Sequence, residues 1–204
     1  AAHYCPNYNH CPPQILGRFQ HFVSKKAMNI DSLGAERIKV LFSANLLKNF
    51  SSFYQLKQED LIGLASFDKE NKASIQEKGA KNIIQAINKS KEVEFEKVLY
   101  ALGIRYVGEV TAKRLATTFQ NIESLIKASK EELLSVEDVG ERIANSIIDY
   151  FSREENLDQI KQLKDLGLQF EIKQTQKTSN KLECLSFVVS RTFANFSREK
   201  KKKI

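Results

Sequence analysis

Apolar residues recur between residues 15 and 173 at the three- and four-residue spacing that is typical of amphipathic helices. All three prolines precede Gln14, so no later residue forbids a long helix. The pattern predicts a mostly α-helical fold. The side chains expected in its core are Phe19, Phe22, Val23, Ile38, Leu41, Phe42, Leu56, Leu61, Ile62, Ile83, Ile84, Ile87, Val98, Leu99, Leu102, Ala112, Leu115, Ala116, Phe119, Leu133, Leu134, Ile143, Ile147, Ile148, Phe151, Leu157, Ile160 and Leu163.

The helical pattern stops near residue 173, and the composition then changes. Residues 173–181 contain no apolar side chain, which indicates a linker, and Leu185 opens a short β-type run. Residues 5–13 pair two cysteines with prolines and turn residues, as in one knuckle of a zinc site. We therefore predict four segments, which are a partial zinc finger at 1–14, a helical domain at 15–173, a linker at 174–181 and a truncated β/α start at 182–204.

One five-residue pattern, apolar-x-x-apolar-Gly, occurs four times within the helical domain. Its fifth positions are Gly34, Asp68, Gly108 and Gly140, separated by 34, 40 and 32 residues. A repeat at such a period predicts one supersecondary unit used several times. Because a helix is expected after each glycine, the unit is a helix-hairpin-helix. The second copy has aspartate in the glycine slot and a polar run at 69–79, which we interpret as a packing unit with a surface insertion.

Each glycine-containing hairpin has the chemistry of an anion site. Glycine allows a positive φ and close approach of another backbone, and the first-turn amides of the next helix are free to donate to phosphate. Glycines that serve only tight turns are the alternative. Three copies, each followed closely by a basic residue, favour the minor-groove backbone of DNA. The candidate contacts are Gly34 and Arg37, then Arg105, Gly108, Thr111 and Lys113, and finally Gly140 and Arg142.

Charge and cysteine content limit the alternatives. The net charge is +7, but residues 181–204 hold +5 of it, so the helical body has no general basic field. Cys5 and Cys11 form half of a four-cysteine zinc site, or two free thiols, and we expect no stable metal in this chain alone. Three cysteines favour a reducing cytoplasm, and no apolar run has the length of a membrane span. No catalytic constellation is visible.

Three stretches of the sequence resemble bacterial NAD-dependent DNA ligases. They are residues 95–115, which include Gly-Ile-Arg-Tyr-Val-Gly-Glu, residues 21–34, and the Cys-Pro-Asn-x-x-x-Cys-Pro segment from Cys5. Residues 185–193 resemble the first strand of a BRCT domain. The order zinc finger, four hairpins and BRCT domain also matches that family.

The resemblance implies that the parent enzyme seals nicks in duplex DNA during replication and repair, using NAD, Mg²⁺ and a structural zinc. Its adenylated lysine lies in a Lys-x-Asp-Gly motif, which these 204 residues lack. We therefore expect a monomeric fragment in the bacterial cytoplasm that binds nicked nucleoid DNA and is inactive alone. Asp68, Cys184 and Arg191 depart from the family pattern, and we expect no BRCT function. A split ligase complemented in trans by a catalytic chain and a protein-binding scaffold are the alternatives.

Overall fold

The computed structural model describes residues 11–65 and 74–172, which belong to one compact unit ending at Ile172. The predictions for Cys5, Asp68, the linker at 174–181 and the BRCT-like start at 182–204 lie outside the described residues. The described part is almost entirely helical, and its only β pairing consists of two isolated bridges. The mostly α fold is therefore confirmed.

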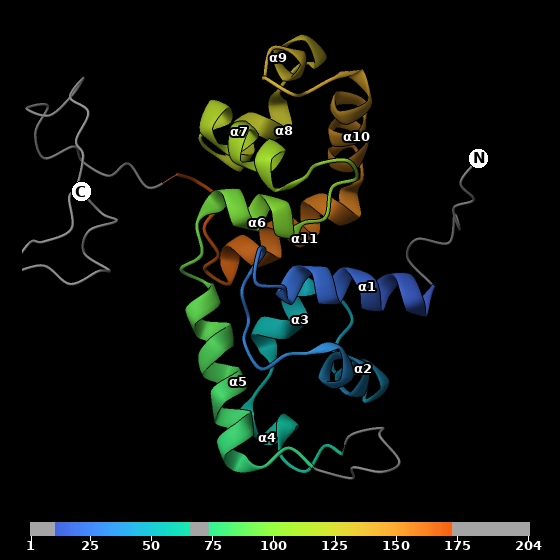
Figure 1. Ribbon diagram of the computed structural model, residues 1–204, viewed down its shortest axis with the longest axis vertical. Coiled ribbons are helices and arrows are strands. Elements are labelled where there is room, and N and C mark those ends of the chain that lie inside the picture. The colour runs from blue at the N-terminus through green and yellow to red at the C-terminus, as the bar shows by residue number, and fades with distance from the viewer. Residues whose placement is uncertain (1–10, 66–73, 173–204) are drawn as a thin grey trace, which may run out of the picture. The chain divides into compact units, whose positions relative to one another are not determined.

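The helices follow one another with short connections (Figure 1). Their bounds are α1 (Pro12–Val23), α2 (Ala35–Ser43), α3 (Phe50–Gln55), α4 (Gln58–Leu61), α5 (Glu77–Ser90), α6 (Phe95–Ala101), α7 (Glu109–Phe119), α8 (Ile122–Lys127), α9 (Lys130–Leu134), α10 (Glu141–Phe151) and α11 (Glu154–Asp165).

Helix ends follow local sequence rules, with one change from the prediction. The first helix starts at Pro12, inside the segment assigned to the zinc finger, because proline at the first helical positions has a suitable φ and needs no amide partner. Ser129 and Glu132 form the expected capping box at the start of α9. Gly167, with a φ of 93°, follows α11 as expected.

Helices that are neighbours in sequence pack in pairs, and these pairs form the hairpins. The first pair is α1 with α2, the third is α6 with α7, and the fourth is α9 with α10. Figure 1 shows α7 to α10 gathered on one side of α6 and α11, with α1 to α5 on the other. Helix α11 contacts both α3 and α10, so it joins the two groups.

Aromatic side chains dominate the core beneath the first hairpin. The Phe22 and Phe50 rings are stacked with centroids 4.4 Å apart, and the Phe19 and Phe53 rings meet edge to face at 5.4 Å. All four side chains are buried. Burying each contributes about 1.5–3 kcal/mol, so this cluster holds α1 and α3 together.

Three residues expected in the core are instead exposed. Ile62, Leu134 and Ile148 keep 47%, 38% and 41% of their surface accessible. Each directly follows a buried residue, and successive helical side chains point about 100° apart. The apolar stripe is therefore one residue narrower at these places than predicted.

Of the predicted surface insertion at 69–79, the structure describes residues 74–79, where Gln76, Glu77 and Lys78 are exposed as expected and Ile75 is not. Ile75 is buried, its amide donates to the Leu64 carbonyl at 2.9 Å, and its carbonyl accepts from the Gly63 amide at 3.0 Å. Helix α5 then starts at Glu77. Ile75 is the one large apolar residue of this polar run, and its burial fixes the segment to the core.

Candidate nucleic-acid interface

The turns of the first, third and fourth hairpins share one construction. The two apolar residues of each pattern are buried, while the glycine is exposed. The left-handed backbone conformation falls two residues before each glycine, at Ser32, Tyr106 and Asp138, whose φ values are 69°, 67° and 63°. The sharp bend of each turn is therefore made by a residue other than glycine.

The glycines themselves are not required by the fold, which corrects the conformational reason predicted for them. Gly34, Gly108 and Gly140 have φ values of −75°, −84° and −90°, which any residue adopts. A Cβ built at each would meet no atom within 4 Å. What the absent side chain provides is open space above the following helix.

Each of these glycines is the N-cap of a helix, and α2, α7 and α10 are called the glycine-headed helices below. In α7 the intrahelical bonds begin with the Ala112 amide donating to the Gly108 carbonyl at 2.8 Å. The amides of the preceding first turn, at 109–111, therefore lie ahead of the helix's own bonding. Within the described residues, no side chain caps α2, α7 or α10.

Three other helices show the contrasting arrangement. The side chains of Asn49, Asn121 and Ser129 accept hydrogen bonds from first-turn amides of α3, α8 and α9, at 3.0, 2.8 and 3.2 Å. Such a cap stabilises a helix by about 0.5–2 kcal/mol. Side-chain caps of this kind therefore stand at α3, α8 and α9, whereas α1, α5, α6 and α11 start without one, as the glycine-headed helices do.

The structure places the predicted basic residues differently from one hairpin to the next. Arg37 turns back within its own hairpin, where its Nη1 donates to the Ser32 carbonyl at 2.6 Å. Arg105 and Arg142 meet at the Tyr106 ring, although they come from different hairpins. Lys113 is exposed on α7, and Thr111 in the same helix is half-buried.

A glutamate lies in the first turn of every glycine-headed helix, and each has a lysine beside it. These lysines reduce the repulsion that the carboxylates would exert on an approaching anion. The hydrogen bond from Lys26 to Glu109 also raises the pKa of Lys26, and it joins the first hairpin to the third. The three pairs are Lys39–Glu36 at 2.7 Å, Lys26–Glu109 at 3.0 Å and Lys130–Glu141 at 4.0 Å.

The third and fourth hairpins are linked reciprocally through their turns. Ser146 of α10 donates to the Arg105 carbonyl at 2.8 Å. Arg114, at the equivalent position of α7, lies 2.6 Å from the Asp138 carboxylate and 3.4 Å from that of Glu137. Each turn thus contacts the glycine-headed helix of the other hairpin. No local sequence signal predicted these contacts, since the partners lie far apart in the chain.

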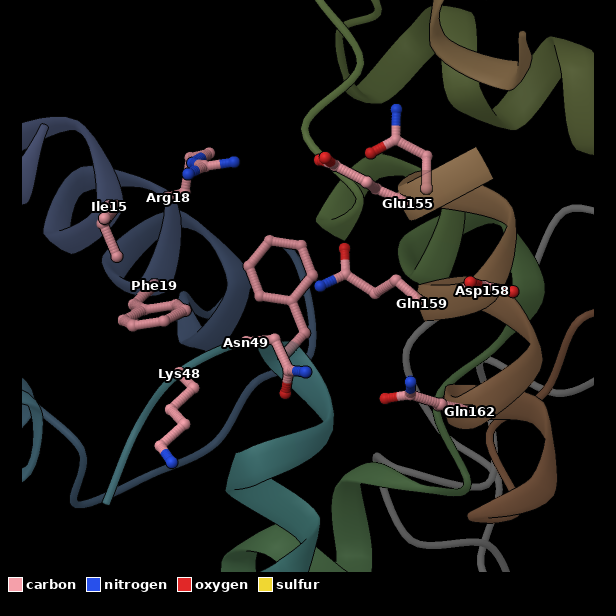
Figure 2. A pocket seen from close by; sticks show the side chains of 11 residues that line it. Ile15, Arg18, Phe19, Lys48, Asn49, Glu155, Asp158, Gln159 and Gln162 are labelled. Carbon is pink, nitrogen blue, oxygen red and sulfur yellow. The ribbon is translucent and has the colours of Figure 1, made fainter. Parts of the chain in front are cut away.

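Open grooves border two of the glycines. One of about 330 Å³ includes Gly34 and Ala35 in its lining, and one of about 590 Å³ lies between α1 and the third hairpin beside Gly108. Figure 2 shows a different pocket, of about 260 Å³, lined by α1, α3 and α11. There Arg18 and Lys48 share the lining with Glu155 and Asp158, so opposite charges balance and no anion is favoured.

The zinc half-site remains a prediction. Cys11 is half-buried at the N-cap of α1, and Cys5 is outside the described residues. Among the residues that the structure describes, no three His, Cys, Asp or Glu side chains gather where they would hold a metal. None of the described helices is both long and apolar enough to cross a bilayer.

Comparison with known families agrees with this geometry. A family model described as "Helix-hairpin-helix motif" matches residues 97–160, which cover the third and fourth hairpins. These hairpins have the two helices, the tight turn and the glycine N-cap of such a unit. The segment is therefore a helix-hairpin-helix structure.

Relatives extend the assignment to the full sequence. The chain is 45% identical over its whole length to a DNA ligase of Christiangramia forsetii and to one of Flavobacterium johnsoniae, and 44% identical over 99% of its length to one of Parabacteroides distasonis. It spans about 30% of the length of these relatives. The chain is homologous, along essentially all of its length, to one segment of DNA ligases.

Proposed function

We propose that this segment grips the sugar–phosphate backbone of nicked duplex DNA on behalf of an NAD-dependent DNA ligase. The amides of the glycine-headed helices donate to phosphate oxygens, and Arg37, Arg105, Lys113 and Arg142 add charge around them. Thr111 supplies a hydroxyl in the first turn of α7. Contacts of this kind position a protein on DNA without selecting a base sequence.

One observation carries the proposal, namely that three glycines stand where the fold itself accepts any residue. Asparagine or serine at these N-caps would stabilise the helices more than glycine does. An external group that must approach the backbone closely accounts for glycine at all three positions. The uncapped amides ahead of each helix indicate that this group is an anion.

Several hairpins are needed to give useful affinity. A hydrogen bond to a charged group contributes about 1.5–3 kcal/mol net, whereas micromolar binding requires about 8 kcal/mol. A single helix N-terminus therefore binds phosphate too weakly to hold DNA. Three such ends in one compact unit reach that range together.

The chemistry of joining belongs to other parts of the ligase. These residues contain no Lys-x-Asp-Gly motif, so the lysine adenylated from NAD and the Mg²⁺ used with it are assigned to the remainder of the enzyme. We propose that the segment acts as a monomer in the bacterial cytoplasm, in replication and repair. Cys5 and Cys11 would complete a zinc site only with two further ligands.

Binding of a nicked duplex to Gly108→Val/Gly140→Val tests the proposal. Fluorescence anisotropy should show an affinity loss of about tenfold or more, since each valine blocks close approach of a phosphate. Wild-type affinity should fall roughly 40-fold between 50 and 200 mM salt if about three phosphates are neutralised. Gly79→Ala, which adds a methyl group in α5, is the matched control. Unchanged binding of the double variant, with its helicity intact, would overturn the proposal.

A further inference from the structure

Two guanidinium groups from different hairpins converge on the ring of Tyr106. The Arg105 Cζ lies 4.8 Å from the ring centroid, and the Arg142 Cζ lies 4.1 Å from it. The Arg142 Nη2 also donates to the Tyr106 hydroxyl at 2.6 Å. Arg105 and Tyr106 belong to the turn of the third hairpin, whereas Arg142 lies in the first turn of α10.

The turn itself gives no reason for an aromatic residue at this position. Tyr106 has a φ of 67°, which is uncommon for a bulky side chain. The equivalent positions in the first and fourth hairpins are the smaller Ser32 and Asp138. The residue also keeps 39% of its surface exposed, so burial in the core does not explain it either. What distinguishes Tyr106 is its contact with the two arginines.

We propose that Tyr106 is a positioning residue that couples the third and fourth hairpins, so that their glycine-headed helices bind DNA as one unit. The ring fixes the directions of Arg105 and Arg142, and the hydroxyl ties the third turn to the start of α10. This inference rests on the proposed DNA-binding function. It adds a reason why the proposed phosphate sites at the N-termini of α7 and α10 act together.

Besides the Ser146 hydrogen bond, Arg114 also links these hairpins, but its ion pairs are less suited to this task. Arg114 joins α7 to the fourth turn through Glu137 and Asp138, whose side chains are 80% and 63% exposed. Ion pairs with exposed carboxylates weaken as salt rises. Contacts between a ring and guanidinium groups include packing as well as charge. The Tyr106 contacts therefore persist at salt concentrations where the Arg114 pairs are screened.

Tyr106→Asn removes the ring and suits the turn, because asparagine tolerates a positive φ. We expect about tenfold weaker binding of a nicked duplex, and a salt slope that is shallower by about 1 as the arginines lose their fixed positions. Tyr106→Phe keeps the ring and loses only the hydroxyl, which accepts an exposed charge-assisted hydrogen bond from Arg142, so its loss should be about threefold, smaller than that of the asparagine variant. The phenylalanine variant also provides the test if the asparagine variant fails to fold.

A double-mutant cycle separates positioning from a general effect on stability. Arg142→Ala should weaken binding in the wild-type background and have little further effect beside Tyr106→Asn, because the two residues act through one contact. Arg153→Ala removes an exposed cation just before α11 and is the charge-matched control, with wild-type binding expected.

The possible outcomes distinguish the two proposals. Additive effects of Tyr106→Asn and Arg142→Ala would overturn the positioning role. A lower melting temperature with unchanged affinity and salt slope would also overturn it, because that result describes a purely structural residue. Wild-type protein that shows no salt-dependent DNA binding would overturn the proposed function, and the inference with it.

Discussion

Helices α7 and α8 follow one another in the chain, yet their N-termini are built in opposite ways. The N-cap of α8 is Asn121, whose side chain accepts a hydrogen bond from the Ser124 amide at 2.8 Å. The N-cap of α7 is Gly108, which has no side chain to accept one. In α8 a side chain of the protein accepts the hydrogen bond of a first-turn amide. In α7 no side chain does so, and the first-turn amides are available to a ligand.

This difference separates residues that stabilise the fold from residues that bind. A side-chain cap contributes about 1 kcal/mol, whereas a helix dipole attracts an external anion by about 0.3–1 kcal/mol. What sets the glycine-headed ends apart from the other uncapped helices is glycine at the N-cap, which leaves room for a ligand to reach the amides. Changes at glycine-headed ends should therefore alter binding, and changes at capped ends should alter stability.

The largest effect is expected from Gly108→Asp/Gly140→Asp. Aspartate is a favourable N-cap, so the melting temperature should stay equal or rise. The two carboxylates would occupy the positions proposed for phosphate, and affinity for a nicked duplex should fall by about 100-fold. Anisotropy and thermal unfolding on the same samples measure both quantities.

The uncharged pair Gly108→Asn/Gly140→Asn isolates the role of charge in that result. Asparagine has the size of aspartate and is an equally good cap. It should weaken binding less than aspartate does. Equal losses of affinity for the two pairs would show that side-chain bulk alone is responsible. No loss for either pair would contradict the claim that the glycine-headed ends bind DNA.

Tyr54 belongs to the capped helix α3 and should affect stability alone. Its hydroxyl lies 3.0 Å from the Ser90 Oγ, and burial raises the pKa of Tyr54 to about 12. The unfolded chain releases this proton near pH 10, so the stabilisation is complete below pH 10 and is lost as pH rises toward 12.

Urea unfolding of the wild type and of Tyr54→Phe at several pH values measures this effect. All other titrating groups are the same in both proteins, so their contributions cancel when the two free energies of unfolding are subtracted. The advantage of the wild type over the variant should shrink by about 1.4 kcal/mol per pH unit above pH 10. DNA affinity at pH 8 should be the same for both proteins. A difference in stability that does not change with pH would contradict the assignment.

Removing the caps should have the next largest effect. Asn49→Ala, Asn121→Ala and Ser129→Ala should each lower the free energy of unfolding by about 1 kcal/mol, which corresponds to about 2–4 °C in melting temperature. Their affinity for nicked DNA should remain within about twofold of the wild type, because these ends satisfy their own amides. A large loss of binding in any of them would show that capped ends also contact DNA.

The sequence predicted local features well and contacts between hairpins poorly. Periodic apolar residues located the helices, and the Ser129 capping box was visible as a four-residue pattern. The need for positive φ was assigned to Gly108, although it falls at Tyr106, because the pattern does not show which residue makes the bend. The Arg142–Tyr106 contact joins residues 36 apart, and only the packing of α10 against the third turn reveals it.

The smallest expected effect concerns the glutamates of the glycine-headed helices. Glu109→Gln removes a carboxylate from the first turn of α7, where it lies 3.0 Å from Lys26. Affinity for the nicked duplex should rise about twofold to threefold at low salt, because less negative charge faces the phosphate. Glu154→Gln, in the first turn of α11, is the control. Weaker binding of Glu109→Gln would show that the Lys26 pair holds the hairpins in place.

The most direct test of the central claim is an amide nitrogen–proton NMR titration with nicked duplex. The account predicts the largest shift changes at residues 35–37, 109–111 and 141–142, the first turns of the glycine-headed helices. First-turn amides of α3, α8 and α9 should change little. Saturated binding with the main changes at the capped ends, and none after Gly34, Gly108 and Gly140, would contradict the account.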